Sequence, residues 1–239
     1  MTRIDTQSNI LCNICGNPLD IQNMKLTPDM REALFCNRCG SISRDRMMIF
    51  GLQDHLTTSV PLAKMAVNKQ FRVLETSGTR GHPSILNHLF DYYNIFYEPD
   101  CLKSADFDKR KFGDLENLTF SDNFFDVILC SDVLEHVRFY EKAISEISRV
   151  LKNEGVFILQ VPYLGFDKKN YQLVKAQGDK DVFLTEPQYH DAHTLVYQIF
   201  GGLDLLPALW KSGFYVKLIE REIPEHAISW QQVINCVKP

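Results

Sequence analysis

Short apolar runs alternate with helical segments through the middle of the chain, and the rest of the sequence is organised around this pattern. Between the runs, apolar residues at helical spacing predict helices at about 83–91 and 139–151. Alternation of this kind is typical of a parallel sheet flanked by helices, in which ligands bind at the carboxyl ends of the strands. The predicted strands are 71–75, 94–97, 125–130 and 156–161.

The part of the chain that follows these strands has two different patterns. Residues 162–192 show weak periodicity and many polar groups, and a segment of that length in a compact domain is usually a lid or a substrate-binding insertion. Beyond it, the pattern predicts a helix at 203–212 and adjacent strands at 214–219 and 227–237. We expect these two strands to finish the sheet as an antiparallel hairpin.

Two C-x-x-C pairs lie ahead of the predicted sheet. They are separated by 20 residues, and a glycine directly follows the second cysteine of each pair. Four thiolates at this spacing can surround one zinc ion tetrahedrally, and the metal would fold a segment too small to hold a core alone. Such a site is closed to water, so its role would be structural; the alternative is four unligated buried cysteines. The four residues are Cys12, Cys15, Cys36 and Cys39.

These patterns suggest a division of the chain. We expect a zinc-ribbon-like segment at 1–45, linking helices at 46–70, and a catalytic domain at 71–239 that contains the 162–192 insertion. Within the first two parts, helices are predicted at about 45–56 and 61–68.

Composition narrows the class of protein. A length of 239 residues allows one sizeable core and a small appendage, and a net charge of −4 argues against broad attraction to nucleic acid or anionic membranes. No run approaches the roughly 18 apolar residues that a membrane span needs. The first residues lack a secretory pattern, and an odd cysteine count favours a reducing compartment, so we expect a cytoplasmic protein. Nothing in the sequence predicts an oligomeric state.

Acids and glycines fall at the carboxyl ends of the predicted strands. The turn at 76–81 would let backbone approach a ligand closely, and Glu98 or Asp100 is placed to accept hydrogen bonds from ribose hydroxyls. Asp114 is placed to bind an exocyclic amine. Taken alone, each feature is more simply interpreted as part of an ordinary turn or surface. Together, after successive strands, they favour a nucleotide-like ligand.

Several motifs in this region resemble a known family. Three stretches are similar to successive motifs of class I S-adenosylmethionine-dependent methyltransferases of the type 11 group. They are FDVI at 125–128, VLEHV at 133–137 and ISRVLKNEG at 147–155. The resemblance covers about 71–220 and implies a Rossmann-like, seven-stranded, mostly parallel sheet with helices on both faces, here joined to a small N-terminal zinc ribbon. A narrower likeness is to ribbon-bearing members associated with cell-surface glycan or other secondary pathways.

The resemblance also implies roles for particular residues. Asp114 and Leu115 would flank the adenine, Glu98 or Asp100 would hold the ribose, and Ser131 and Asp132 would border the sulfonium. The methionine part of the cofactor would contact Glu75, Ser77, Gly78, Thr79 and Gly81.

The first turn departs from the family pattern D-x-G-x-G-x-G. Ser77 and Thr79 align with its first two glycines, and side chains there would narrow the approach of the cofactor, while Gly81 is retained near the third glycine. S-adenosylmethionine binding is therefore expected, with this turn as its least regular part.

A transferred methyl group needs an aligned acceptor, and an oxygen acceptor also needs a base with a pKa near the working pH. Our first candidate for the base is His190 and the second is His136. The alternatives for His190 are a polar residue of the lid and, less favoured, a metal ligand together with Asp191 and His193.

The expected function is methyl transfer to oxygen or nitrogen of a small polar acceptor such as a sugar-linked metabolite. A second hypothesis is an RNA methyltransferase that grips RNA through its ribbon, although the acidic balance of the chain counts against it. A third is a non-catalytic scaffold with a methyltransferase-like fold. The basic residues available to the second hypothesis are Arg31, Arg38, Arg44, Arg46 and the 109–111 cluster.

Overall fold

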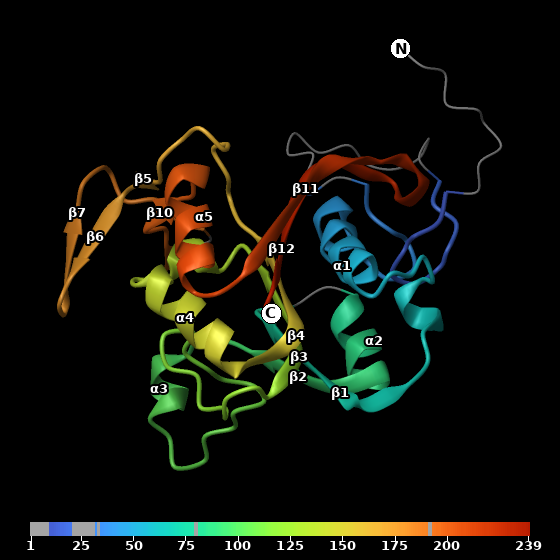
Figure 1. Ribbon diagram of the computed structural model, residues 1–239, viewed down its shortest axis with the longest axis horizontal. Coiled ribbons are helices and arrows are strands. Elements are labelled where there is room, and N and C mark those ends of the chain that lie inside the picture. Colours follow the sequence, from blue (N-terminus) through green and yellow to red (C-terminus); the bar gives the residue numbers. More distant parts are fainter. Residues whose placement is uncertain (1–9, 21–31, 33, 79–80, 191–192) are drawn as a thin grey trace.

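A six-stranded sheet carries the core of the part of the chain that the computed structural model describes, residues 10–20, 32, 34–78, 81–190 and 193–239 (Figure 1). The strand order is β11-β12-β4-β3-β1-β2. The first four strands in sequence are parallel, and β12 runs antiparallel to both β4 and β11. The strands are β1 (Asn68–Thr76), β2 (Phe90–Ile95), β3 (Phe125–Ser131), β4 (Leu151–Gln160), β11 (Tyr215–Ile223) and β12 (Ile228–Val237).

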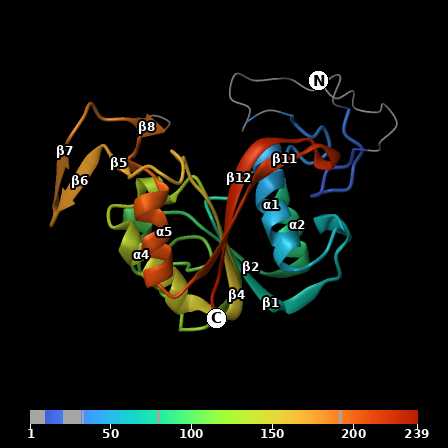
Figure 2. The same cartoon turned by 45° about the horizontal axis from the view of Figure 1, so that its top comes forward.

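Helices cover both faces of this sheet, as predicted. In Figure 2, α1 (Ser43–His55) and α2 (His82–Leu89) lie on one side, and α4 (Tyr140–Val150) and α5 (Gly202–Lys211) lie on the other. The apolar stripe of α4 is fully buried against the sheet. The mostly parallel, Rossmann-like architecture and its final antiparallel hairpin are therefore confirmed. Shorter helical turns are η2 (Leu62–Lys64), α3 (Pro99–Leu102), η3 (Leu134–His136) and η4 (Pro224–His226).

The prediction of seven strands is wrong for the described residues. Beside the edge strand β2, where a seventh strand would lie, the described residues form one isolated parallel bridge, between Phe96 and Phe112. Its hydrogen bonds reach from Asn94 to the carbonyl of Arg110 and from Phe96 to that of Lys111. The preceding residues are polar and lack the alternation that would bury one face of a strand, so the pairing does not propagate.

Strand β2 begins four residues earlier than the predicted range of 94–97. Helix α2 ends at Leu89, and Phe90 and Ile95 are buried in the sheet directly after it. The shift has a consequence for the candidate ribose ligand. Glu98 does not end the strand but follows it by three residues, at the cap position of α3.

Helix α1 is part of the core rather than an external linker. Met47 and Leu52 are fully buried, and they belong to one apolar cluster with Val156 and Ile158 of β4. At Gly51 the helix approaches the sheet so closely that Asn235 of β12 donates a hydrogen bond to its carbonyl, at 2.9 Å. Cys12, Cys15 and Cys36 belong to the same cluster, and Cys39 packs against it. The division at 45 and 70 stays a prediction, and these contacts show how closely its three parts are packed.

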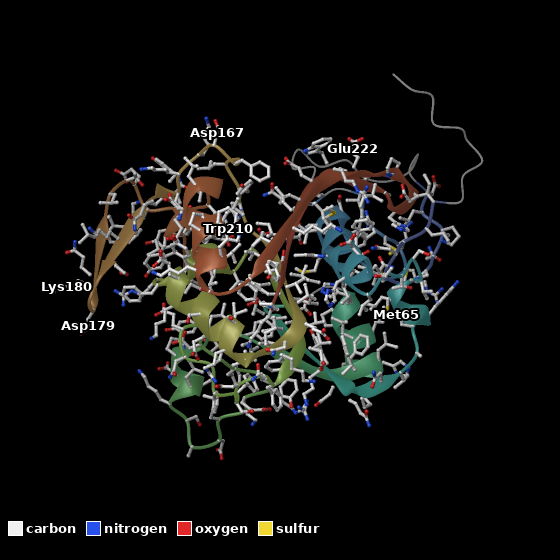
Figure 3. All side chains as sticks on the ribbon, viewed as in Figure 1. Met65, Asp167, Asp179, Lys180, Trp210 and Glu222 are labelled. Atoms are coloured by element: carbon white, nitrogen blue, oxygen red, sulfur yellow. The ribbon has the colours of Figure 1, made fainter. Side chains whose placement is uncertain are left out.

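The 162–192 insertion has secondary structure of its own. A hairpin of β6 (Val174–Gln177) and β7 (Lys180–Phe183) extends away from the sheet, with Asp179 and Lys180 at its tip (Figure 3). Short strands β5 (Tyr171–Gln172) and β8 (Tyr189–His190) pair with β10 (Gln198–Ile199) and β9 (Thr194–Leu195), which follow the insertion. Among the described helices, none combines the length and the apolar character required to cross a membrane.

Candidate functional site

The carboxyl ends of β1 and β3 meet at a small cavity. These strands are neighbours in register, with Thr76 opposite Cys130, and the chain order reverses at β1, which has β2 on its other side. Ligands of open α/β sheets bind at such a reversal. The cavity has a volume of about 60 Å³ and is lined by Arg44, Asp45, Met48, Glu75, Thr76, Ser77, Gly78, His82 and Ser131.

The turn that follows β1 has the backbone shape of a glycine turn although it begins with serine. Ser77 has a φ of +58°, a left-handed conformation that costs a residue with a Cβ about 1–2 kcal/mol. Gly78 is required for a different reason, because a Cβ there would overlap the Glu75 carboxylate. Asn94 of β2 holds the turn by accepting from the Gly78 amide and donating to its carbonyl. Thr79 lies outside the described residues.

Glu75, predicted to contact the cofactor, has buried partners. Its carboxylate accepts hydrogen bonds from the Tyr92 hydroxyl and from His82 Nε2, the latter at 2.6 Å. Burial lowers the pKa of His82, but the charge of Glu75 and its hydrogen bond outweigh this, so the pKa is raised overall. Glu75 therefore supports the turn from beneath as well as lining the cavity. His82, Tyr92 and Asn94 were not identified from the sequence, because only the tertiary contact with Glu75 and Gly78 gives them a role.

The stability that His82 contributes is expected to fall as the pH rises. Its folded-state pKa lies above the ordinary value of 6.5, so the contribution is complete below about pH 6.5 and is lost as the pH passes through the folded value. The difference in free energy of unfolding between wild type and His82→Gln should therefore shrink from pH 5.5 to pH 8, roughly the range where histidine titrates. Urea unfolding at several pH values measures it, and a constant difference would contradict the charged pair.

Arg44 reaches into the cavity from the start of α1. It forms an ion pair with Asp132, directly after β3, and a second one with Glu32 at 2.6 Å. Ser131 lines the cavity beside this contact, and the Asp132 amide donates to the Gln160 carbonyl of β4 at 3.0 Å. The two residues predicted to border the sulfonium are thus together, and one of them is paired with an arginine from the N-terminal part of the chain.

The residues predicted to hold the nucleoside lie elsewhere along the same edge of the sheet. Glu98 and Asp100 are exposed in and around α3, and Asp114 accepts a hydrogen bond from the Glu116 amide at 2.8 Å. Leu115 is buried in the apolar cluster that contains Ile95. None of these four side chains lines the 60 Å³ cavity, so their cofactor roles stay predictions.

The four predicted metal ligands form one cluster. The Sγ atoms of Cys12 and Cys39 lie 3.7 Å apart, as do those of Cys15 and Cys36, and all four lie within 4.8 Å of one another. Zinc–sulfur bonds of 2.3 Å in a tetrahedron give edges of about 3.8 Å, so the donor set fits one zinc ion. The glycines that follow the two pairs both have a φ of +73°, as the knuckle geometry predicts.

A buried arginine lies against this cluster. The guanidinium of Arg46 is fully buried and donates to the carbonyl oxygens of Leu34, Ser41, His226 and Ala227 at 2.6–2.9 Å. Burial lowers its pKa, and the charges of the cysteine thiolates act in the opposite direction. Four thiolates around one Zn²⁺ carry a net charge of −2, which matches a buried cation. Arg44 and Arg46 are thus both engaged in contacts within the protein.

The two candidate bases lie next to each other although 54 residues separate them in sequence. His136 Nε2 on η3 is 3.1 Å from His190 Nδ1 on β8, and His136 Nδ1 is 2.8 Å from the Leu195 carbonyl oxygen. The carboxylate of Glu135 is fully buried, and its Oε1 lies 3.8 Å from both ring nitrogens. Glu135 lies within the VLEHV motif, but the motif alone does not indicate that its carboxylate faces both imidazoles. Asp191 lies outside the described residues, and His193 is exposed.

A second cavity of about 290 Å³ opens beyond the end of β4. Gln160, the last residue of that strand, lies between it and the first cavity. Its Oε1 is 3.4 Å from Ser131 Oγ, and its Nε2 donates to the Gln232 carbonyl at 3.1 Å. The lining residues are Val161, Tyr163, Glu220, Trp230, Gln231 and Gln232.

Comparison with known proteins finds a family match for the middle of the chain. Residues 78–159 match the family model of the methyltransferase domain. An uncharacterized protein of Methanocaldococcus jannaschii is 38% identical over 106 residues, which are 43% of this chain and 46% of that protein. The match thus spans about half the length of this relative.

Two solved structures have a similar arrangement. An S-adenosylmethionine-dependent methyltransferase from Mesorhizobium loti is 16% identical, with a TM-score of 0.46 over 73% of this chain and 93% of that one. The 1,6-didemethyltoxoflavin-N1-methyltransferase of Burkholderia thailandensis is 15% identical, with a TM-score of 0.46 over 81% and 78% of the two chains. Because both TM-scores are below 0.5, the assignment of the domain rests on the sequence match.

Proposed function

We propose that this chain, whose residues 78–159 match the family model of the methyltransferase domain, transfers a methyl group from S-adenosylmethionine to oxygen or nitrogen of a small polar acceptor. One observation carries the proposal. The matched domain begins at the glycine turn, and that turn lines a cavity at the point where the strand order reverses.

In this proposal, different residues around the cavity contact different parts of the cofactor. When bound, S-adenosylmethionine supplies an electrophilic methyl group. Ser77, Gly78 and Gly81 would contact its methionine part through the turn, supported by Glu75 from beneath. Ser131 and Asp132 would border the reacting end. Along the same edge, Glu98 would hold the ribose, with Asp100 as the alternative, and Asp114 and Leu115 would flank the adenine.

A small acceptor is supported by the second cavity. Its volume of about 290 Å³ is at the lower end of the range of ligand pockets, roughly 300–1,000 Å³. Glu220, Gln231 and Gln232 provide polar contacts, and Trp230 provides an aromatic face. Gln160 connects this cavity to Ser131, where the methyl group would be presented. His190, with His136 as the second candidate, would accept a proton from the acceptor.

Arg44 must move for the cofactor to enter. A cavity of about 60 Å³ is far smaller than any nucleotide pocket, and the Arg44–Asp132 ion pair lies at its edge. Because Arg44 and Asp132 are mostly buried, part of the cofactor's binding energy would be spent on breaking this ion pair. The same contact favours a second candidate function, a methyltransferase-like scaffold that keeps this cavity closed and binds no cofactor.

Calorimetry with S-adenosylmethionine separates the two functions. The enzyme hypothesis predicts binding by wild-type protein, and Glu98→Ala is expected to weaken it about 10- to 100-fold, the effect of losing a hydrogen bond to a charged group. Asp100→Ala, two residues away and equally exposed, is the matched control and should bind like wild type.

Two other results of the binding measurements would change the assignment. Weakened binding by Asp100→Ala with normal binding by Glu98→Ala would move the ribose role to Asp100. If wild-type protein does not bind at millimolar cofactor, the enzyme hypothesis fails and the scaffold remains.

The proposal includes one structural zinc ion held by Cys12, Cys15, Cys36 and Cys39. The sulfur distances and the buried Arg46 support it. Because thiolates must stay reduced to bind zinc, we also propose a reducing, cytoplasmic location.

A further inference from the structure

We propose that Glu135, His136 and His190 bind a divalent transition-metal ion, separate from the ion of the cysteine cluster. The proposed role of this ion in catalysis rests on the proposed methyl transfer, whereas its binding does not. One imidazole comes from η3 at the end of β3, and the other comes from β8 of the insertion. The ligand atoms all lie within 4.8 Å of one another.

The distances among the three ligand atoms fit a metal ion. His136 Nε2 and His190 Nδ1 are 3.1 Å apart, and Glu135 Oε1 is 3.8 Å from each of them. A triangle with these sides has a point about 2.1 Å from all three corners, and bonds of zinc to imidazole nitrogen and carboxylate oxygen are about 2.0–2.2 Å long. The three side chains therefore need no large movement to take up an ion.

The tautomer of His136 is set correctly for a ligand. A carbonyl oxygen only accepts hydrogen bonds, so the contact of 2.8 Å with Leu195 places the proton of the neutral ring on Nδ1. The lone pair on Nε2 then faces His190 and Glu135. Metal-bound histidines are commonly oriented in this way by a carbonyl or carboxylate on their other nitrogen.

The charge of the donor set is compatible with a cation. Glu135 is fully buried, and a buried carboxylate requires compensation by positive charge or by several hydrogen bonds. A divalent ion between the three groups would pair with this carboxylate and with two neutral imidazoles. Arg138 lies three residues after Glu135 in the sequence, but its guanidinium forms an ion pair with Asp181 of the insertion.

Two imidazole nitrogens and one carboxylate oxygen select the class of ion. This donor set suits borderline transition metals such as Zn²⁺ or Fe²⁺, and three protein ligands leave at least one position open. His136 lies four residues after Asp132, which is assigned to the reacting end, and the open position is proposed to receive the acceptor. An acceptor hydroxyl that binds there would have a lowered pKa and would release its proton to water; with the ion bound, His136 and His190 would act as ligands in place of the base role given to them above. The ion would also tie the insertion to the end of β3.

Cobalt titration of protein whose cysteine cluster already holds zinc tests this site. Calorimetry is expected to find one additional Co²⁺ per chain, and the absorption spectrum is expected to lack the sulfur-to-cobalt charge-transfer band of a thiolate site. His190→Ala should weaken Co²⁺ binding at least about tenfold, since it removes a ligand. Glu135→Gln should do the same. Because Glu135 is buried, urea unfolding must first establish that Glu135→Gln folds. His190 is half-exposed, so His190→Ala is expected to fold and can test the site even if Glu135→Gln does not.

A matched control and separate readouts complete the experiment. His88→Ala, at an exposed histidine on α2 outside the cluster, should bind Co²⁺ like wild type. Equal affinity in His190→Ala and His88→Ala, or no Co²⁺ beyond the cysteine cluster, would overturn the proposal and leave a hydrogen-bonded histidine pair only. Binding of S-adenosylmethionine is measured on the same samples without Co²⁺, so failure of the metal site and failure of the proposed function are distinguishable.

Discussion

Replacing Arg46 by methionine is expected to lower the free energy of unfolding by about 3–5 kcal/mol, the cost of removing one member of a buried charged group. The guanidinium is fully buried and donates to four carbonyl oxygens, two from the N-terminal segment and two from the turn before β12. Methionine fills much of the same volume but donates nothing. The substitution would also leave the thiolate cluster without its compensating charge, so zinc should be retained less firmly.

Urea unfolding and metal analysis measure these two effects. Arg38→Met is the matched control, because Arg38 lies within the second C-x-x-C pair but is exposed. Arg46→Lys keeps the charge without the planar fork of donors and should fall between the two. A loss no larger than that of Arg38→Met would contradict the stabilising role of Arg46. Less than about half a zinc ion per chain in freshly purified wild-type protein would count against the four-cysteine site itself.

Replacing Gly81 by alanine is expected to weaken S-adenosylmethionine binding at least about tenfold and to cost about 1–3 kcal/mol of stability, the range for overpacking. A Cβ at this position would overlap the carbonyl oxygen of Cys39, and backbone yields less readily than a side chain. Gly81 belongs to the candidate cofactor turn, and Cys39 belongs to the cysteine cluster. The alanine would therefore push the turn and the cluster apart and distort both.

Gly178→Ala separates this contact from the conformational effect of losing a glycine. Gly178 has a φ of +56° against +26° for Gly81, but a Cβ there meets nothing within 4 Å. Both variants carry the cost of an L-residue at positive φ, and only Gly81→Ala adds the overlap. Calorimetry and thermal unfolding of the two variants should therefore differ. Equal behaviour would mean that the turn does not depend on its contact with Cys39.

The cysteine cluster and the candidate cofactor turn are in direct contact. Cys39 touches the turn after β1, and α1, which begins four residues later at Ser43, contributes Arg44, Asp45 and Met48 to the cavity. The N-terminal segment therefore forms a wall of the candidate cofactor site. Loss of zinc is expected to affect cofactor binding for this reason, although the metal itself would be structural.

Local sequence patterns predicted what depends on neighbours along the chain. The spacing of Cys12, Cys15, Cys36 and Cys39 identified a cluster because each pair forms within one short knuckle, whose glycine permits the required backbone. The apolar runs identified the parallel strands because a strand buried on both faces must be apolar at every position. Strand β3 matches its predicted range of 125–130 to within one residue.

Tertiary structure decided what depends on residues far apart. Arg44 and Arg46 look like surface arginines in the sequence, yet one enters the cavity and the other is buried, because α1 packs on the sheet. The seventh strand is reduced to one bridge because the segment beside β2 has no apolar alternation to bury. His136 and His190 meet Glu135 because the insertion folds back onto the end of β3. Periodicity reports which face of an element is buried, but it does not report which distant side chain will lie against that face.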